Sequence, residues 1–276
     1  MNVCETVIVS RQNKQVVLLG KLGERKHRAK EGLFRFDGKK LFLEATFCGL
    51  DVRRIFLRES ESTELLSFVR ERGDVLAETM MYVLADDVFD KLSEERAPEG
   101  IISVAAFPTV HTGGEMLAEY AEDAQKRIFL VESVRDPGNV GTILRSAAAF
   151  GVDLLVMSRD CADLYNPKTV RGAMGALFRQ RICVVDDLPA AISVLREHGR
   201  RVLAATLDDT SVSIADVNVS RRDCLVVGNE GHGLSAETVR ACAGSIIIPM
   251  QEGSESLNAG VAASVLMWEQ YRGEQK

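Results

Sequence analysis

The 276-residue chain lacks several patterns that would assign it to a particular class of protein. No apolar run approaches the roughly 20 residues that span a bilayer, and no cationic leader followed by an apolar run stands at the start. We therefore expect a cytoplasmic protein without a membrane partner. Its glycines show neither the Gly-x-Gly-x-x-Gly order of a dinucleotide fold nor the Lys-Ser/Thr that follows a phosphate-binding loop.

Cysteine and histidine are too few and too scattered to predict a metal site. The six cysteines include no Cys-x-x-Cys pair, and the four histidines have no zinc-ligand spacing. Several cysteines adjoin apolar runs, which favours reduced, buried thiols over a disulfide framework. We expect no metal.

The net charge of −6 hides an uneven distribution of charge. Residues 11–40 hold ten Lys or Arg against three Asp or Glu, which leaves 24 basic and 37 acidic residues in the rest of the chain. A charged stretch is usually a solvated face. The alternative is a surface that binds RNA phosphates, and the candidate contacts are then Arg11, Lys14, Arg25, Lys26 and Arg28.

Residues 128–146 combine a strand, a turn and the start of a helix. The apolar run of residues 128–131 is followed by Asp-Pro-Gly, which ends a strand, and Asn139 can then cap a helix with apolar residues at helical spacing. Arg145 lies off that apolar stripe. Taken alone, this first motif is compatible with a capped surface helix that carries a solvated arginine.

Residues 225–235 form a second motif, in which an apolar strand leads into a glycine-rich turn. Gly228 would let a ligand approach the backbone closely. Glu230 supplies one carboxylate, and Ser235 can cap the helix that follows. On its own, the segment is equally typical of a plain glycine-rich turn.

Residues 246–258 form a third motif of the same kind. Proline ends the apolar strand, and a loop leads to the last helix, for which Ser256 can be the cap and Asn258 a first-turn residue. Helical spacing places four apolar residues on one face of that helix, namely Leu257, Val261, Val265 and Trp268.

The three motifs together resemble the TrmH (SpoU) family of RNA 2′-O-ribose methyltransferases, of the SPOUT superfamily. The family pattern is Asn-x-Gly-x-x-x-Arg, then Gly-x-Glu-x-x-Gly-Leu-Ser, then Ile-Pro-Met followed by Ser-Leu-Asn. The chain matches it at residues 139–145, 228–235 and 248–258, and the resemblance covers roughly residues 126–272. One departure is Ala259-Gly260, where many relatives carry Val-Ser; there we expect altered packing and unchanged chemistry.

The basic segment and its surroundings also resemble the small substrate-binding domain that precedes the catalytic domain in many of these enzymes. That domain is a compact α/β sandwich akin to RNA-binding ribosomal proteins. Relatives usually show Glu-Gly where Asp37-Gly38 stands here. This resemblance favours the RNA-facing interpretation of Arg11, Lys14, Arg25, Lys26 and Arg28.

We therefore predict an α/β protein with an RNA substrate-binding domain at residues 1–110, a linker at 111–124 and a methyltransferase domain at 125–276. Strands and helices alternate beyond the linker, which predicts a parallel sheet covered by helices on both faces. In such sheets the ligand lies outside the carboxyl ends of the strands, where all three motifs occur. The resemblance adds a trefoil knot, which pattern rules would exclude.

The chemistry that the resemblance implies is methyl transfer from S-adenosylmethionine to a ribose 2′-hydroxyl. The cofactor would contact the backbone of Gly228, Ile248 and Leu257, with Met250 nearby. The same resemblance implies a homodimer formed through the catalytic domain. Ribosomal RNA is the first choice of substrate, since the first domain resembles that of rRNA-modifying relatives, and transfer RNA is the alternative.

Arg145 is the key residue of the family pattern. Because arginine stays protonated at ordinary pH, we interpret it as a clamp that stabilises the forming alkoxide and holds the neighbouring phosphate. Asn139 and Glu230 would fix Arg145 and the motif loops by hydrogen bonds, and Ser256 and Asn258 would orient the ribose. A purely capping role for Asn139 and Ser256 stays open.

Two other classes of function are possible. A non-catalytic RNA-binding protein of this fold would keep the basic segment and lose motif residues, yet all five polar motif residues are present. A methyltransferase of another fold would need Gly-x-Gly-x-Gly after its first strand, or a cysteine nucleophile, and neither pattern occurs.

Overall fold

The computed structural model describes residues 2–3, 6–72, 76–108, 111–112, 114–208, 211–251 and 256–273. It divides into two compact units. The first consists of Met1–Thr109 and Tyr165–Arg179, and the second of Val110–Leu164 and Gln180–Lys276. Each unit has a sheet of its own and is described by itself.

The first unit is built on a mixed five-stranded sheet in the order β1-β4-β3-β5-β2. Strand β5 is antiparallel to both of its neighbours, and the other pairs are parallel. Its elements are β1 (Asn2–Val3), α1 (Lys14–Lys21), α2 (Arg25–Glu31), β2 (Leu33–Asp37), α3 (Lys39–Phe47), β3 (Val52–Arg58), η1 (Glu59–Glu61), α4 (Ser62–Arg70), β4 (Met80–Leu84), α5 (Asp86–Leu92), β5 (Ile101–Ala106), α8 (Pro167–Ala173) and η3 (Ala176–Phe178).

Helices cover both faces of this sheet. Buried residues of α1 and α5 form one cluster with β3, β4 and β5, while α3 packs against β2 and α4 against β3. This confirms the α/β character expected for the first part of the chain.

Residues 165–179 complete the core of the first unit, although they come between two strands of the second sheet in chain order. Tyr165 lies 5.1 Å from Phe34 and stacks on Phe107 at 3.9 Å between ring centroids. Helix α8 ends at Ala173, because Met174 and the next residue adopt left-handed backbone, with φ of 49° and 87°. A short 3₁₀ turn follows.

The second unit contains an eight-stranded sheet in the order β11-β13-β10-β12-β7-β8-β9-β6. Every neighbouring pair is parallel, as predicted. Its elements are β6 (His111–Thr112), α6 (Gly114–Glu122), β7 (Ile128–Val131), α7 (Pro137–Ala149), β8 (Leu154–Ser158), β9 (Ile182–Val185), α9 (Leu188–Glu197), β10 (Arg201–Ala205), β11 (Val212–Ser213), η4 (Ile214–Asp216), β12 (Asp223–Val227), α10 (Ala236–Ala241), β13 (Gly244–Ile247) and α11 (Ala259–Arg272).

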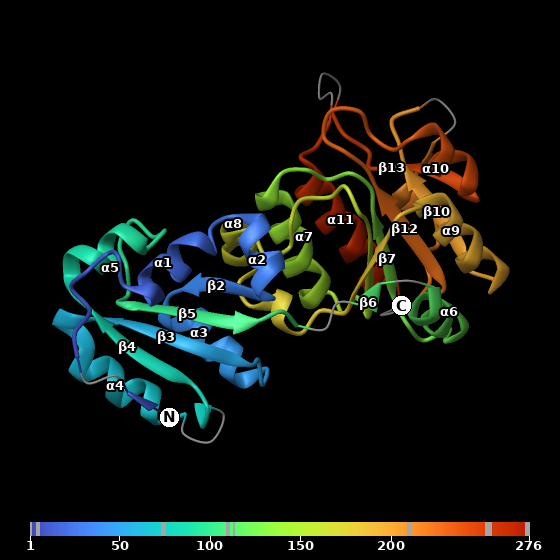
Figure 1. Cartoon of the computed structure of the whole chain (residues 1–276). Helices are drawn as coiled ribbons and strands as arrows, with labels where there is room; N and C mark the ends of the chain where they lie inside the picture. The colour runs from blue at the N-terminus through green and yellow to red at the C-terminus, as the bar shows by residue number, and fades with distance from the viewer. Residues whose placement is uncertain are drawn as a thin grey trace. The chain divides into compact units, whose positions relative to one another are not determined.

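Two helical layers sandwich this sheet, as Figure 1 shows for α7 and α11 on one side and α9 and α10 on the other. Buried residues of α6 and α9 form the core with alternate residues of the central strands. α6 occupies much of the stretch expected to be a linker, and its buried Leu117, Tyr120 and Ala121 belong to that core.

Local sequence explains where several helices begin. Asp136, Asn166 and Asp187 are the N-caps of α7, α8 and α9, and each is followed by proline in the first turn. Asp136 accepts a hydrogen bond from the backbone N–H of Asn139 at 2.9 Å. The predicted capping role of Asn139 is therefore wrong: Asn139 lies inside the first turn, and its side chain is available for other contacts.

Candidate functional site

A cavity of about 460 Å³ lies at the carboxyl ends of β10, β12 and β13. This volume is within the range of small-molecule sites. The three strands are neighbours on one side of β7, so the loops that follow them meet at one edge of the sheet. The lining comes from residues 205–207, 227–234, 246–248, 250, 256–257, 259 and 262.

The four predicted cofactor contacts all line this cavity. Gly228 follows β12, Ile248 and Met250 follow β13, and Leu257 precedes α11. Glu230 and Ser256 line the cavity as well. The structure thus brings the second and third motifs together around one hollow; residues 252–255 of the connecting loop lie outside the described residues.

Glycine at position 228 is required by close packing of the backbone. A Cβ atom at Gly228 would lie 2.3 Å from the carbonyl carbon of Gly233 and 2.5 Å from the nitrogen of Leu234. Asn229 and Gly233 exchange two backbone hydrogen bonds of 3.0 Å, which close the turn. The result is a narrow loop whose backbone borders the cavity.

One carboxamide joins all three motifs. Asn139 Nδ2 donates to Glu230 Oε1 at 2.6 Å, and Asn139 Oδ1 accepts from Asn258 Nδ2 at 2.9 Å. The predicted hydrogen bonds of Asn139 and Glu230 toward the motif loops agree with this geometry, but neither residue bonds Arg145 of the same chain as predicted. Arg145 has no part in the network: its side chain is exposed on α7 and forms no hydrogen bond or ion pair to any described residue.

Asn258, and not Ser256, caps the last helix. The side-chain oxygen of Asn258 accepts from the backbone N–H groups of Gly260 and Val261 at 3.0 and 3.2 Å, and α11 begins at Ala259. The capping role predicted for Ser256 is therefore wrong, because the chain enters the helix two residues later. Ser256 is instead exposed at the cavity. Ser235 caps α10 as predicted, and accepts from Thr238 N at 3.1 Å.

The sequence profile of the SpoU rRNA Methylase family matches residues 126–268, more than half of the chain. The chain belongs to the SpoU rRNA methylase family. A second profile, the MRM3-like substrate binding domain, matches residues 13–103. The two profiles lie in the parts of the chain where the two resemblances were found.

Two curated relatives of this SpoU family member are rRNA methyltransferases. The 23S rRNA (guanosine(2553)-2'-O)-methyltransferase RlmP of Bacillus subtilis is 30% identical over 261 residues, covering 95% of this chain and 97% of the relative. The 23S rRNA (uridine(2479)-2'-O)-methyltransferase of Streptomyces viridochromogenes is 29% identical, covering 91% and 86%. Among solved structures, the SpoU methyltransferase AviRb of the same organism, in complex with AdoMet, has a TM-score of 0.81 at 27% identity, covering 96% and 99%.

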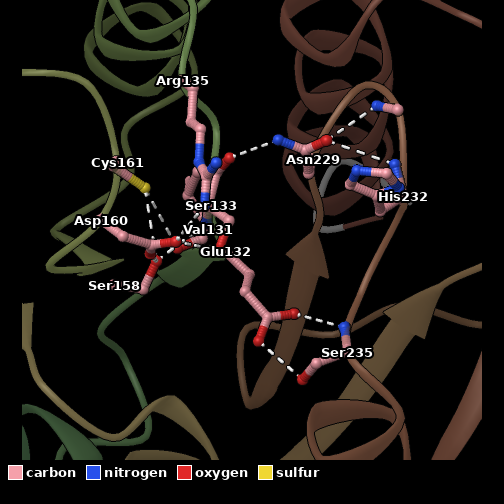
Figure 2. Close-up of polar contacts among 11 residues, drawn as sticks. Val131, Glu132, Ser133, Arg135, Ser158, Asp160, Cys161, Asn229, His232 and Ser235 are labelled. Carbon is pink, nitrogen blue, oxygen red and sulfur yellow. Dashed lines mark hydrogen bonds and ion pairs between the residues drawn. The ribbon is translucent and has the colours of Figure 1, made fainter.

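The SpoU domain contains polar residues near the motifs that sequence patterns did not single out. Glu132 and Ser133 directly follow β7, and Asp160 follows β8. Figure 2 shows Ser133 beside Asn229, Glu132 beside Ser235, and Asp160 beside Ser133. Burial alone would raise the pKa of Asp160, but hydrogen bonds from the hydroxyls of Ser133 and Ser158 and from Arg135 outweigh it and lower that pKa. Glu132 could have been found from the sequence, because it is a polar residue directly after a fully buried strand.

The thiols of the SpoU domain are poorly suited to nucleophilic chemistry. Cys161, Cys183 and Cys224 are buried and free, as expected for structural thiols. Burial raises the pKa of Cys224 to about 12, so its thiolate is disfavoured. Among the described residues, no three His, Cys, Asp or Glu side chains gather so as to hold a metal ion. Each helix of the described residues is too short or too polar to cross a bilayer.

The predicted RNA contacts of the first unit separate into two groups. Lys14, Arg25 and Lys26 are exposed on α1 and α2, while Arg11 is exposed and paired with Asp87 at 3.3 Å. Arg28 departs from the prediction. It is 2% exposed, and its guanidinium donates to the carbonyls of residues 22 and 23 at 2.8 and 2.7 Å, so it joins α1 to α2 and is not on an RNA-facing surface.

Proposed function

We propose that this protein transfers the methyl group of S-adenosylmethionine to a ribose 2′-hydroxyl of structured RNA, with ribosomal RNA as the first choice of substrate. The observation that carries the proposal is the hydrogen-bonded chain Glu230–Asn139–Asn258, which joins one polar residue from each motif beside the cavity. Two of the relatives described above are named as 23S rRNA 2'-O-methyltransferases, which supports an rRNA substrate. Transfer RNA is the alternative.

The cavity has the features that S-adenosylmethionine requires. Gly228 leaves backbone exposed where any side chain would fill the loop, and Ile248, Met250 and Leu257 add apolar surface around it. We assign these four residues to cofactor binding. When bound, the cofactor supplies a methyl group activated by a sulfonium, so the protein needs only to align the acceptor and to assist loss of its proton.

The polar motif residues would divide the remaining work. Asn139 and Glu230 hold the first and second motifs together. We assign Ser256, which lines the cavity, to orienting the ribose. The Asn258 carboxamide is engaged with Asn139 and with the start of α11, so Asn258 would serve the site by holding the third motif in place. Arg145 would stabilise the forming alkoxide and hold the adjacent phosphate, because its charge is permanent.

A homodimer would account for the position of Arg145. The side chain is exposed on α7 and forms no hydrogen bond to the network that it is expected to serve; in a dimer it would complete the site of a second subunit. Neighbouring α11 exposes apolar side chains: Val261 is 47% and Trp268 44% exposed. Apolar surface of this kind suits a two-fold interface. Light scattering on the active protein should give the mass of two chains; an active monomer would refute this part of the proposal.

We assign different roles to the two units of the chain. The first unit would capture RNA through Arg11, Lys14, Arg25 and Lys26, and the second would carry out methyl transfer. We also propose that the protein acts in the cytoplasm, and that its C-terminal segment forms the trefoil knot implied by the resemblance.

Arg145→Ala tests the proposed reaction. It should abolish methyl transfer from radiolabelled cofactor to RNA, while the cofactor dissociation constant measured by calorimetry changes by no more than a few fold. Arg240→Ala is the matched control, since Arg240 is an exposed arginine of the same unit paired with Glu237. A large loss of cofactor binding in folded Arg145→Ala would contradict the assignment. Ribose-methylation maps of total RNA from wild-type and deletion cells would identify the substrate.

A further inference from the structure

The second-motif loop, residues 228–235, is attached at its exit to Glu132. The Glu132 carboxylate accepts hydrogen bonds from the backbone N–H and the hydroxyl of Ser235, both at 2.8 Å, and from the Thr238 hydroxyl at 2.6 Å. Glu132 is 8% exposed and Thr238 fully buried. These bonds satisfy a carboxylate whose burial would otherwise be costly, and they hold Ser235 and the start of α10 against the end of β7 (Figure 2).

The entry of the loop is attached to the next residue of the chain, Ser133. Asn229 Nδ2 donates to the carbonyl oxygen of Ser133 at 2.7 Å. The side-chain oxygen of Asn229 accepts from the backbone N–H groups of Gly231 and His232 at 2.8 and 3.2 Å. One carboxamide therefore shapes the turn and fastens it to the connection between β7 and α7.

Ser133 is itself held in a conformation that serine rarely adopts. Its φ of 55° lies in the left-handed region. Its N–H donates to Ser158 Oγ at 2.8 Å, and its hydroxyl donates to Asp160 at 2.6 Å. Residues of this kind persist where their surroundings hold them, and they concentrate at ligand sites. The attachment point for Asn229 is thus fixed in turn by the loop after β8.

We propose that Glu132 and Asn229 are positioning residues that hold the second-motif loop in the shape that binds the cofactor. Glu132 fixes the exit at Ser235, Asn229 fixes the entry at Ser133, and the backbone at Gly228 stays aligned between them. Glu132 does not line the cavity; Asn229 does, but its carboxamide is engaged with the protein. The inference rests on the proposed function, because it assigns the cavity to S-adenosylmethionine.

Glu132→Gln and Asn229→Ala test this inference. The dissociation constant for S-adenosylmethionine, measured by calorimetry, should rise at least tenfold, and the KM for the cofactor should rise with it. The kcat at saturating cofactor and the KM for RNA should change less than threefold, because neither side chain touches the acceptor. Glu237→Gln is the matched control, because it makes the same substitution at an exposed side chain of α10 that is paired with Arg240. The affinity of this variant for S-adenosylmethionine should equal that of the wild type.

Hydrogen exchange supplies a readout that does not depend on activity. In protein without cofactor, the amides of Gly231, His232 and Ser235 should exchange faster in both variants than in the wild type. Thr238→Val, which removes one hydrogen bond to Glu132 and keeps the volume, serves if Glu132→Gln does not fold.

Three results would overturn the inference. Unchanged cofactor affinity in folded variants would do so, as would unchanged exchange at the loop. A loss confined to kcat would assign the two residues to the chemistry. Failure of the wild type to bind cofactor would instead refute the proposed function, and the exchange rates would still decide whether Glu132 and Asn229 hold the loop.

Discussion

Gly228 is the position where the backbone of the second motif leaves no room for a side chain. Replacement by alanine would place Cβ 2.3 Å from the backbone of Gly233, well inside contact distance, so the loop would have to open. We expect Gly228→Ala to weaken S-adenosylmethionine binding at least tenfold by calorimetry. Gly231→Ala is the control, since its Cβ would meet only the Asn229 side-chain oxygen at an ordinary 3.5 Å; an equal loss in both variants would contradict the steric explanation.

Asp223 couples the stability of the second unit to pH. Burial would raise the pKa of its carboxyl, but hydrogen bonds from Arg201 and from the N–H and hydroxyl of Ser220 outweigh burial and hold that pKa below its ordinary value of 3.8. A lowered pKa gives stability that is present above pH 3.8 and lost as pH falls through the folded pKa. Asp223→Asn should therefore lower the free energy of unfolding at pH 7 by about 1–3 kcal/mol.

The difference in free energy of unfolding between the wild type and Asp223→Asn should shrink when denaturant titrations are repeated below pH 4. A difference that stays constant from pH 7 to pH 3 would show that Asp223 acts by packing and not by its charge. Glu237→Gln, at an exposed carboxylate, should show no comparable loss at pH 7.

At the scale of elements, the pair α7 and α11 depends on a small residue where the helices meet. A Cβ at Gly260 would lie 3.1 Å from Thr142 Cβ, and Ser146 and Ser264 share a hydrogen bond of 2.7 Å nearby. Gly260, one of the two residues that depart from the family pattern, therefore packs directly against Thr142. We expect Gly260→Ser to lower the free energy of unfolding by about 1–3 kcal/mol.

Thr142→Ala should restore part of that loss, because it removes the Thr142 methyl group, which would lie 3.2 Å from the new Cβ. The measurement is a double-mutant cycle of unfolding free energies in urea. Additive losses would show that the two positions do not interact. The same variants report on the proposed dimer if their association constants are measured.

At the scale of the whole molecule, the basic residues of the first unit make a prediction about RNA affinity. Reversal of Arg25 and Lys26 to glutamate should weaken RNA binding and flatten the dependence of log affinity on log salt, because about one counterion is released per phosphate neutralised. Cofactor affinity should not change. Filter binding across a salt series gives the slope.

Reversal of Arg70 and Lys91 is the matched control, since both are exposed in the same unit and lie outside the basic segment. Equal effects of the two pairs would indicate a general charge effect. Residues 11–40 would then be a solvated face without a specific role in RNA binding. Arg28→Ala should behave differently from either pair: its buried guanidinium joins two helices, so the loss should appear in the melting temperature of the first unit.

The three motifs and the alternation of strands and helices beyond the predicted linker followed from the sequence by itself, because their signals are local. Helix α6, inside the predicted linker, did not. Buried strands are continuous apolar runs, and helices start at Asp or Asn followed by proline, so neighbours in the chain decide them. The helix caps of the first and third motifs were misplaced by two or three residues, since several polar residues compete there.

Only the tertiary structure decided which polar groups meet and which basic residues are exposed. Asn229 and Ser133 are 96 residues apart, and Glu132 and Ser235 103 apart; they become partners because β7 and β12 are neighbours in the sheet. Residues 165–179 likewise leave the second sheet to complete the core of the first unit. Strand order arises from the packing of the whole chain, and spacing along the sequence shows neither that order nor the burial of a charged residue such as Arg28.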